Sequence, residues 1–432
     1  MAKKAWVVAV DMGYGHQRAA HALKGLAFQG KVIAANDYPY IPPRDKAIWK
    51  ETRQVYEFVS RFKKVPVLGD LVFALLDKVQ EIKDFYPKEQ GIEPPGFQVQ
   101  AMYQLMEKQG WGEHLIEKLN EDPLPLIATF SVIAFMAEYW GYKAPIFLLA
   151  TDSDAARAWV PLKAKSTKIK YCAPTERVAA RLLQYGVPSS QISLTGFPLP
   201  QEFIKKQGLL QTKEDLQRRL AVLDPQRRYL TKYADVVRRY LGRVPEIQKA
   251  RAPTITFAIG GAGAQQDLAE DILSSLAPLL KKGQVHLQIV AGTHQDAAQG
   301  FLQAAKGLGL SAVLGKELSI IVKETKDEYF KDFPGILRKT DILWTKPSEL
   351  SFYAALGIPL LLSSPIGSQE VQNQEWLLKI GSGIKQLNPE FSHEWILDFI
   401  NQGLFAEAAM QGYVEMERNG TANIASLVAS SS

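Results

Sequence analysis

The sequence contains almost no cysteine. Cys172 is the single cysteine among 432 residues, and this count excludes an internal disulfide framework. A chain without disulfides is typical of a reducing cytosol, so we expect Cys172 to be an inert, half-buried thiol. The chain also has only six histidines, and their positions show no zinc-ligand spacing. The composition therefore indicates neither disulfide nor zinc chemistry.

Long apolar runs are missing as well. The candidate apolar stretches around residues 131–140 and 359–362 fall well below the roughly 20 residues that a membrane-spanning helix needs. Near the start of the chain, Asp11 interrupts the apolar run that follows the first lysines, and no small-residue cleavage site comes after it. We therefore expect no signal peptide, and a cytoplasmic protein that is either soluble or peripheral to the inner face of the membrane.

A third glycine is absent from the first glycine-rich turn. The apolar run 5–10 leads into Asp11-Met12-Gly13-Tyr14-Gly15-His16, and a helical pattern over 17–28 comes next. A dinucleotide-binding turn needs glycine where Arg18 stands, so NAD binding is disfavoured. The turn still brings His16 to the end of a strand, near a helix N-terminus that can hold phosphate or sugar groups. The alternative is a purely structural turn, because any α/β protein can carry Gly-x-Gly after its first strand.

The chain is basic and long enough for two domains. Its 432 residues are 47% hydrophobic and 22% charged, an ordinary globular composition with room for two independent cores. The net charge of +6 favours anionic partners, and nucleotide sugars, anionic membranes and nucleic acids all qualify. Nucleic acid ranks last and is not expected as a partner, because the sequence has no recognised nucleic-acid-binding module.

Strand-like and helical segments alternate along the chain and predict an α/β fold with two tandem doubly wound, Rossmann-like domains. We place the first domain at 1–198, the second at 199–405, and a helical segment that packs back on the first domain at 406–432. Two prolines and a glycine in 196–200 interrupt the pattern and mark the boundary. The predicted strands are 6–10, 31–35, 126–130, 145–149 and 168–172, and then 254–259, 284–291, 311–314, 341–344 and 359–362.

Two segments fall outside this alternation. Residues 38–121 carry aromatic and aliphatic side chains among lysines, which suits a membrane-facing or acceptor-covering insertion, although a helical cap packed on the first domain is the favoured alternative. Residues 205–251 contain thirteen lysines and arginines but five acidic residues, a net charge of +8. Contact with an anionic lipid or polyanion needs such local basicity, and a solvated helical hairpin fits equally well.

Two motifs of the second domain suit a nucleotide diphosphate. Gly260-Gly261-Ala262-Gly263 follows the first strand, where exposed backbone N–H groups and the helix from Gln265 would face phosphate. Lys346-Pro347-Ser348-Glu349 leads into a helix that runs to Leu356. Ser348 is suited to cap this helix, and Glu349 either meets the helix dipole or binds sugar or ribose hydroxyls.

Polar residues that follow other strands are suited to bind sugar hydroxyl groups. Gln369, Glu370 and Asn373 are spaced along one helix face, and His294 follows a strand. Asp152 and Asp154 form an Asp-x-Asp that resembles the metal-binding motif of another class of sugar transferases. Because that class has one nucleotide-binding domain and this chain has two, we favour interdomain hydrogen bonding or acceptor contact over a metal role.

Taken in chain order, these motifs resemble those of the GT-B glycosyltransferases that include monogalactosyldiacylglycerol synthases, processive diacylglycerol glucosyltransferases and the lipid-II-forming N-acetylglucosaminyltransferase. The resemblance spans most of the chain. Its motifs are residues 11–16 with Ala19-Ala20, Thr151-Asp152, Trp159, residues 171–176, residues 192–203, Gly260-Gly261-Ala262-Gly263, Thr345-Lys346-Pro347, Gly357-Ile358-Pro359 and Gln369-Glu370 with Asn373.

The resemblance implies a deep interdomain cleft and inverting transfer without an essential metal or cofactor, with a UDP-sugar as the donor substrate. His16 would be the catalytic base or a donor contact. The implied acceptor side comprises Gly13, Tyr14, Gly15, Asp152 and Asp154. The implied donor side comprises Gly260, Gly261, Gly263, His294, Lys346, Pro347, Ser348, Glu349, Gln369, Glu370 and Asn373. The lipid-acceptor members are membrane-peripheral through first-domain loops, which suits the insertion at 38–121. Oligomeric state is not implied.

Departures from the family pattern keep three hypotheses open. Ser348-Glu349 stands where the family usually has two glycines, residues 352–355 replace its Glu-Ala pair, and Ala156 replaces a histidine common in the lipid enzymes. The leading hypothesis is a glycosyltransferase that moves a sugar from a UDP-sugar to a lipid or other hydroxyl acceptor. The alternatives are a nonhydrolysing nucleotide-sugar 2-epimerase and a noncatalytic nucleotide- or lipid-binding protein of the same fold.

Overall fold

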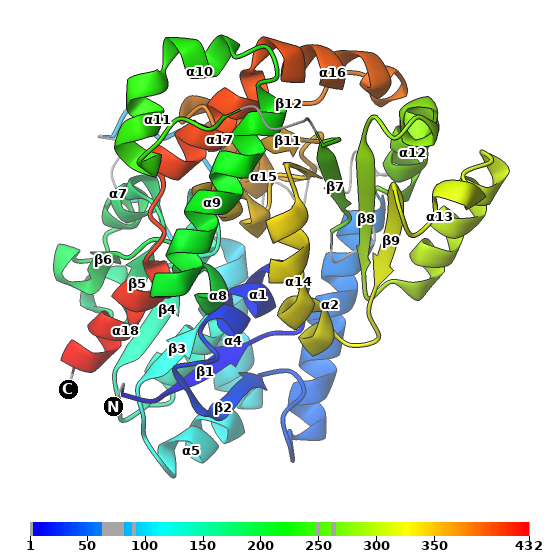
Figure 1. The fold of residues 1–432 in the computed structure, drawn as a ribbon. Coiled ribbons are helices and arrows are strands. Elements are labelled where there is room, and N and C mark those ends of the chain that lie inside the picture. The colour runs from blue at the N-terminus through cyan, green and yellow to red at the C-terminus, as the bar shows by residue number, and fades with distance from the viewer. Residues whose placement is uncertain (1–2, 63–81, 89–91, 247–250, 261–264, 432) are drawn as a thin grey trace. The chain divides into compact units, whose positions relative to one another are not determined.

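The chain divides into two compact units, each built on a parallel sheet. The computed structural model describes residues 3–62, 82–88, 92–246, 251–260 and 265–431 (Figure 1). The first unit contains Met1–Pro200, Ile366–Asn373 and Glu417–Ser432, and the second contains Gln201–Pro365 and Gln374–Met416. The predicted fold class, two tandem doubly wound α/β domains, is confirmed by the two six-stranded sheets found among the described residues.

The sheet of the first unit has the order β2-β1-β3-β4-β5-β6, and every neighbouring pair is parallel. Its central strands are buried apolar runs because helices cover both faces of a doubly wound sheet. All four residues of β4, for example, are buried. The strands are β1 Ala5–Ala9, β2 Ala27–Ala34, β3 Leu126–Ala128, β4 Ile146–Leu149, β5 Lys170–Ala173 and β6 Ile192–Leu194.

The insertion at 38–121 is helical where it is described. Trp49 of α2 packs edge-on against Trp111 at 4.9 Å between ring centroids, and both side chains are almost fully buried. Both belong to the hydrophobic cluster that contains Val8 of β1, so the described part includes a cap packed on the first unit. Residues 63–81 and 89–91 lie outside the described residues. The helices of this unit are α1 Gly15–Ala22, α2 Pro43–Phe62, α4 Phe97–Gln109, α5 Glu113–Asn120, α6 Ser131–Tyr139, α7 Glu176–Gln184 and α18 Gly420–Ser430, with short 3-10 helices η1 Arg157–Trp159, η2 Ala164–Ser166 and η3 Ser189–Gln191.

The sheet of the second unit has the order β12-β11-β10-β7-β8-β9, again all parallel. Its strands are β7 Thr254–Ala258, β8 His286–Gly292, β9 Leu318–Val322, β10 Ile342–Thr345, β11 Leu360–Leu362 and β12 Gly383–Lys385. Its helices are α8 Gln201–Ile204, α9 Lys206–Leu223, α10 Arg228–Lys232, α11 Ala234–Leu241, α12 Gln266–Lys281, α13 Gln295–Gly307, α14 Lys326–Lys339, α16 Ser392–Gln402 and α17 Leu404–Glu415, with 3-10 helices η4 Ser311–Val313, η5 Glu349–Leu356 and η6 Pro389–Phe391. Helix α15, Ser368–Lys379, has residues in both units.

Two predicted elements are wrong in the structure. The strand predicted at 311–314 is the 3-10 helix η4, and the edge strand is β9. The apolar run of β9 has enough length to pair with β8, whereas Val313 already bonds back to the carbonyl of Leu310. The helix predicted over 17–28 ends at Ala22, because the chain turns around Gly25 and residues from Ala27 pair with β1.

Where it is described, the basic segment 205–251 forms the helices α9, α10 and α11 of the second unit. Leu216, Leu220 and Leu223 of α9 are fully buried in the main hydrophobic cluster of this unit. One arginine of the same helix, Arg219, is 2% exposed. The segment is therefore not simply a solvated hairpin, since part of it belongs to the core.

Candidate active site

His16 lies where the carboxyl ends of neighbouring strands meet in the first unit. It is the second residue of α1, directly after the turn that follows β1. Its Nδ1 atom lies 2.6 Å from the carbonyl oxygen of Thr129, which follows β3. The Oγ1 atom of Thr151, after β4, lies 3.4 Å from the same nitrogen. Because β1, β3 and β4 are adjacent in the sheet, residues from three strand ends surround the histidine.

The contact with Thr129 selects the proton position on His16. A carbonyl oxygen only accepts hydrogen bonds, so the 2.6 Å contact requires the proton on Nδ1. In the neutral imidazole, Nε2 then carries the lone pair. A histidine held in this tautomer is prepared to accept a proton at Nε2, which is the chemistry of a general base.

Two aromatic side chains fix the ring plane of His16. The Phe130 ring meets it edge-on, at 4.8 Å between centroids and 84° between planes, and Trp159 lies at 6.1 Å. His16 is half-buried rather than enclosed. Packing and hydrogen bonding together therefore hold the imidazole in one orientation while it keeps access to solvent.

The turn before His16 is held by its own polar contacts. The Asp11 backbone N–H donates to Oδ1 of Asn36 at 2.9 Å, and Nε2 of Gln17 donates to Oδ1 of Asp11 at 2.6 Å. Gly13 has a φ of +85°, a conformation that favours glycine. Tyr14 is buried and precedes Gly15, the first residue of α1. The predicted acceptor-side turn is thus a well-ordered strand-to-helix connection.

Asp154 serves the structure of the first unit. Both of its carboxylate oxygens accept from Arg181, at 3.0 Å from Nε and 2.9 Å from Nη2, and both side chains are 2% exposed. Burial lowers the pKa of Arg181, but hydrogen bonding and attraction to Asp154 outweigh it, so the pKa is raised overall. Asp154 is therefore the structural partner of a buried arginine, and the absence of a metal role for Asp152 and Asp154 stays a prediction.

Asn373 binds the loop that contains Asp152. Its side-chain Oδ1 accepts from the backbone N–H of Ser153 at 2.7 Å, and its Nδ2 donates to Oδ1 of Asp152 at 3.0 Å. Asn373 is fully buried and belongs to the first unit, together with Gln369 and Glu370. These three residues therefore lie in the unit that contains His16, and their predicted role in donor binding stays a prediction.

Strand ends of the second unit bring Gly260 and Lys346 together. A Cβ atom at position 260 would lie only 2.7 Å from Cε of Lys346, so glycine lets the lysine side chain cross the backbone after β7. His294 follows the adjacent strand β8 as the N-cap residue of α13. Gln265, beyond β7, donates from Nε2 to the Ser363 hydroxyl after β11 at 2.6 Å. Gly261 and Gly263 lie outside the described residues.

Ser348 and Glu349 begin the 3-10 helix η5. Ser348 occupies the N-cap position without a side-chain capping bond, so the predicted capping by its hydroxyl is wrong. Pro347 precedes it, and the Ser348 backbone carbonyl accepts from the Ser351 N–H at 2.9 Å. Glu349 is 9% exposed. A carboxylate buried this deeply at a helix start needs polar partners.

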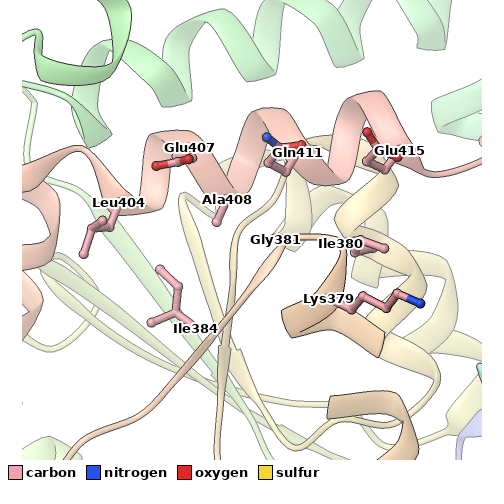
Figure 2. A pocket seen from close by; sticks show the side chains of 9 residues that line it. All are labelled: Lys379, Ile380, Gly381, Ile384, Leu404, Glu407, Ala408, Gln411 and Glu415. Carbon is pink, nitrogen blue, oxygen red and sulfur yellow. The ribbon is translucent and has the colours of Figure 1, made fainter. Parts of the chain in front are cut away.

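A separate groove in the second unit lies away from these strand ends. It has a volume of about 620 Å³ and is lined by the end of α15, the approach to β12 and one face of α17 (Figure 2). Figure 2 shows Glu407, Gln411 and Glu415 along the helix, facing Ile380 and Ile384. Because it borders the amino end of β12, it is not the place where doubly wound sheets bind nucleotides.

The sequence did not reveal several residues that organise these strand ends. Thr129 acts through its backbone carbonyl, which leaves no trace in residue type. Arg219 is one of thirteen basic residues in its segment, and nothing in the pattern separates it from the others.

Cys172 is fully buried rather than half-buried, and burial raises the pKa of its thiol to about 12. No helix among the described residues is long and apolar enough to cross a membrane.

Comparisons with known proteins agree with the motif order. Residues 234–335 match a family described as "Domain of unknown function (DUF6938)". A processive diacylglycerol beta-glucosyltransferase of Bacillus cereus (strain B4264) is 24% identical over 272 residues, which cover 61% of this chain and 56% of that protein. The corresponding protein of Staphylococcus saprophyticus is 20% identical over 290 residues, covering 66% and 61%. The chain thus spans little more than half the length of these relatives.

Two solved structures align with nearly the whole chain at low sequence identity. The MurG crystal structure from Acinetobacter baumannii has a TM-score of 0.45 at 16% identity, covering 99% of both chains. The UDP-GlcNAc 2-epimerase from Neisseria meningitidis, bound to UDP-GlcNAc, has a TM-score of 0.45 at 14% identity, covering 98% of this chain and 99% of that one.

The sequence relatives confirm the resemblance that the motifs indicated. By its ordered motifs and its two doubly wound units the chain resembles the GT-B glycosyltransferases, and the sequence relatives named above, at 20–24% identity, are processive diacylglycerol beta-glucosyltransferases.

Proposed function

We propose that this chain is an inverting glycosyltransferase that moves a sugar from a UDP-sugar to the hydroxyl group of a lipid acceptor, without an essential metal. The observation that supports this most is the tautomer of His16, held by the Thr129 carbonyl at 2.6 Å. The similarity to processive diacylglycerol beta-glucosyltransferases supports the choice of donor and acceptor class. UDP-glucose and diacylglycerol are the first pair to test.

The proposed reaction is a single displacement. Nε2 of His16 takes the proton of the acceptor hydroxyl as its oxygen forms a bond to the anomeric carbon of the donor sugar. The bond from that carbon to the diphosphate breaks at the same time, and its electron pair goes to the phosphate oxygen of UDP. Attack opposite the leaving group inverts the anomeric configuration. A base placed on the hydroxyl contributes about 10² to 10⁴ in rate.

The second unit supplies the donor side of the proposal. Lys346 lies against Gly260 at neighbouring strand ends, and its ammonium group would offset the negative charge that develops on departing UDP. The helix beginning after Gln265 adds backbone N–H groups and the positive end of its dipole. Glu349, buried at the start of η5, would accept hydrogen bonds from ribose hydroxyls.

We further propose that the chain binds the surface of anionic membranes. In the insertion of the first unit, Tyr40 is 86% exposed, Phe97 78% and Tyr86 66%. Large apolar side chains exposed among lysines suit insertion into a lipid headgroup region. Sedimentation with vesicles tests this: binding should rise with the fraction of anionic lipid, and Tyr40→Ser with Phe97→Ser should weaken it. Sedimentation that is independent of anionic lipid would contradict the proposal.

The activity is tested with the purified chain, a panel of UDP-sugars, and diacylglycerol in mixed vesicles. We expect glycolipid and UDP to form in equal amounts, with inverted anomeric configuration by NMR. Chelating agents should leave the rate unchanged if no metal is needed. Formation of an epimeric UDP-sugar without acceptor would replace the proposal with an epimerase. Tight UDP binding without turnover of any donor would replace it with a noncatalytic nucleotide-binding protein.

A further inference from the structure

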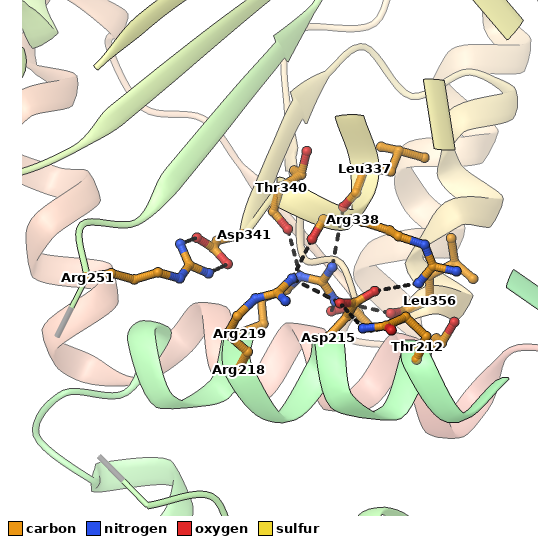
Figure 3. A network of polar contacts seen from close by, with 12 residues as sticks. Thr212, Asp215, Arg218, Arg219, Arg251, Leu337, Arg338, Thr340, Asp341 and Leu356 are labelled. Carbon is orange, nitrogen blue, oxygen red and sulfur yellow. Dashed lines mark hydrogen bonds and ion pairs between the residues drawn. The ribbon is translucent and has the colours of Figure 1, made fainter. Parts of the chain in front are cut away.

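Arg219 caps the carboxyl ends of two helices in the second unit. It extends from α9, and Figure 3 shows its guanidinium directed at the chain around Leu337, Thr340 and Leu356. Nε donates to the Thr340 carbonyl at 2.8 Å, and Nη2 donates to that of Leu337 at 3.4 Å. Nη1 donates to the carbonyls of Leu356 at 3.2 Å and Gly357 at 2.9 Å. These carbonyls end α14 and η5.

The chemistry of this site requires arginine. The last carbonyls of a helix lack intrahelical partners and carry the negative end of its dipole. A planar guanidinium presents five N–H donors in a fixed fork, so one buried side chain can serve two helix ends. Burial lowers the pKa of Arg219 to about 10, which leaves it charged at neutral pH. A lysine would keep the charge but could not reach all four carbonyls.

One of the two helices that Arg219 caps, η5, has an unusual backbone form. η5 is a 3-10 helix of eight residues, whereas runs beyond three or four residues are uncommon. Its first and last turns have the 3-10 bonding pattern, from the Ser351 N–H to the Ser348 carbonyl and from the Gly357 N–H to the Ala354 carbonyl, both at 2.9 Å. All eight residues are buried, so surrounding contacts and not local propensity maintain this form.

Neighbouring helices pack closely against η5. A Cβ atom at Gly357 would lie 2.8 Å from Leu216 of α9, and one at Gly412 of α17 would lie 2.5 Å from the Ala354 carbonyl oxygen. Gly357 also has a φ of +68°. The carboxyl end of η5 is therefore anchored by α9, and the helical form of the segment determines where its amino end, Glu349, stands.

The consequence for Glu349 follows from helix geometry. A 3-10 helix turns about 120° and rises about 2.0 Å per residue, against about 100° and 1.5 Å in an α-helix. Over the seven steps from Leu356 to Glu349, relaxation to α-helix would rotate the carboxylate by about 140° and shift it by about 3.5 Å. Loss of the 3-10 form would therefore change both the position of Glu349 and the direction of its carboxylate.

We infer that Arg219 is a positioning residue for the donor site, which holds η5 in its 3-10 form from the carboxyl end and thereby places Glu349 for the ribose hydroxyls of UDP. The inference rests on the proposed function. It also gives a role to one member of the basic segment that is distinct from lipid or polyanion contact, because Arg219 is 2% exposed.

A double-mutant cycle on UDP affinity tests the coupling. Calorimetry with UDP is applied to the full chain, to Arg219→Met, to Glu349→Gln and to the double variant. Each single change should weaken UDP binding about 10- to 100-fold, as loss of hydrogen bonds to a charged group does. The double variant should bind no more weakly than Glu349→Gln alone. Additive losses, or unchanged affinity in Arg219→Met, would overturn the inference.

Arg338→Met is the matched control for stability. Arg338 belongs to the same polar network, where it pairs with Asp215 at 2.7 Å and donates to the Glu202 carbonyl at 2.7 Å. Among the described residues, the Arg338 side chain makes no hydrogen bond or ion pair with η5. It should destabilise the unit while combining additively with Glu349→Gln. If it couples to Glu349 as strongly as Arg219 does, general loosening of the unit explains the data and the inference fails.

Hydrogen exchange separates this inference from the proposed function. Arg219→Met should speed amide exchange across 350–357 at least tenfold more than across the rest of the second unit, whereas Arg219→Lys should give an intermediate increase and Arg338→Met no increase specific to 350–357. If the unaltered chain binds no UDP, the proposed donor site fails, and the exchange result still decides whether Arg219 holds η5. Unchanged exchange in Arg219→Met would overturn that part directly.

Discussion

At the scale of single residues, the local partner decides what each ionisable group can do. His16 and Asp154 both follow strands of the first sheet, and sequence motifs assigned both to one acceptor side. The structure gives them different surroundings: a backbone carbonyl fixes the His16 tautomer, whereas Arg181 holds both oxygens of Asp154. The tautomer of His16 suits the proposed base, whereas Asp154 maintains the loop that follows β4.

Removing the charge of Asp154 should destabilise the first unit. Asp154→Asn leaves the Arg181 guanidinium buried beside a neutral amide, and breaking a buried pair in this way costs about 3–5 kcal/mol. Urea denaturation measures the change. Asp235→Asn is the control, because its pair with Arg238 is exposed, at 96% and 59%, and should contribute less than about 1 kcal/mol. Equal effects of the two substitutions would show that the buried pair has no special structural role.

At the scale of elements, close backbone approach determines which glycines are required. α17 crosses η5 at Gly412, where an added Cβ would lie 2.5 Å from the Ala354 carbonyl oxygen and 3.0 Å from its Cβ. Gly300, inside α13, has nothing within 4 Å of an added Cβ. Both glycines lie in helices, so helix propensity alone predicts the same effect of an alanine substitution at each. Packing against the helix that carries Glu349 makes them different.

Two alanine substitutions should therefore change the free energy of unfolding in opposite directions. Gly412→Ala should destabilise the second unit by about 1–3 kcal/mol, since rigid backbone has to move, and should weaken UDP binding through η5. Gly300→Ala should stabilise it by about 0.5–1 kcal/mol through helix propensity. Urea denaturation of both variants measures this. A neutral or stabilising Gly412→Ala would contradict the packing of α17 on η5.

The sequence predicts elements well where apolar runs are long and poorly where tertiary contacts decide. The predicted run 284–291 lies close to β8, whereas the short run 311–314, with three apolar residues after Ser311, fits a strand or the 3-10 helix η4 equally well. The length and 3-10 form of η5 could not be predicted, since Arg219, Leu216 and Gly412 that maintain it are distant in sequence. Arg219, the buried arginine of the basic segment, likewise cannot be distinguished by pattern from the other basic residues there.

At the scale of the whole molecule, the fold class and motif order were predictable, while the grouping of the motifs was not. Ordered strand-to-helix alternation predicts doubly wound sheets, and both sheets are present. Asn373, however, joins the loop at Asp152 and Ser153, more than two hundred positions earlier in the chain. Such pairings depend on how the chain returns to the first unit, which periodicity does not report.

Alkaline pH should lower the stability of the folded chain. Burial raises the pKa of Tyr171 and of Tyr185, so in the unfolded chain these phenols ionise near pH 10 while the folded chain keeps them protonated. Unfolding then releases protons, and each phenol lowers the free energy of unfolding by about 1.4 kcal/mol per pH unit above about pH 10. Arg219, with its pKa lowered to about 10, acts in the opposite sense and offsets one such group.

Urea denaturation between pH 9 and 11.5 checks this expectation. Tyr185→Phe should reduce the alkaline slope by about 1.4 kcal/mol per pH unit, beyond a pH-independent loss of about 1 kcal/mol from its hydrogen bond to the Ala155 carbonyl. A slope identical to that of the unaltered chain would show that Tyr185 ionises without unfolding.

The most direct test of the central claim is the turnover number for sugar transfer from UDP-sugar to diacylglycerol by the unaltered chain, His16→Ala and His21→Ala. His21 lies in the last turn of the same helix and controls for effects on α1. The account predicts a 10²- to 10⁴-fold fall in kcat for His16→Ala, with unchanged affinity for UDP and near-normal turnover in His21→Ala. Transfer that proceeds at the same rate without the imidazole of His16 would contradict it.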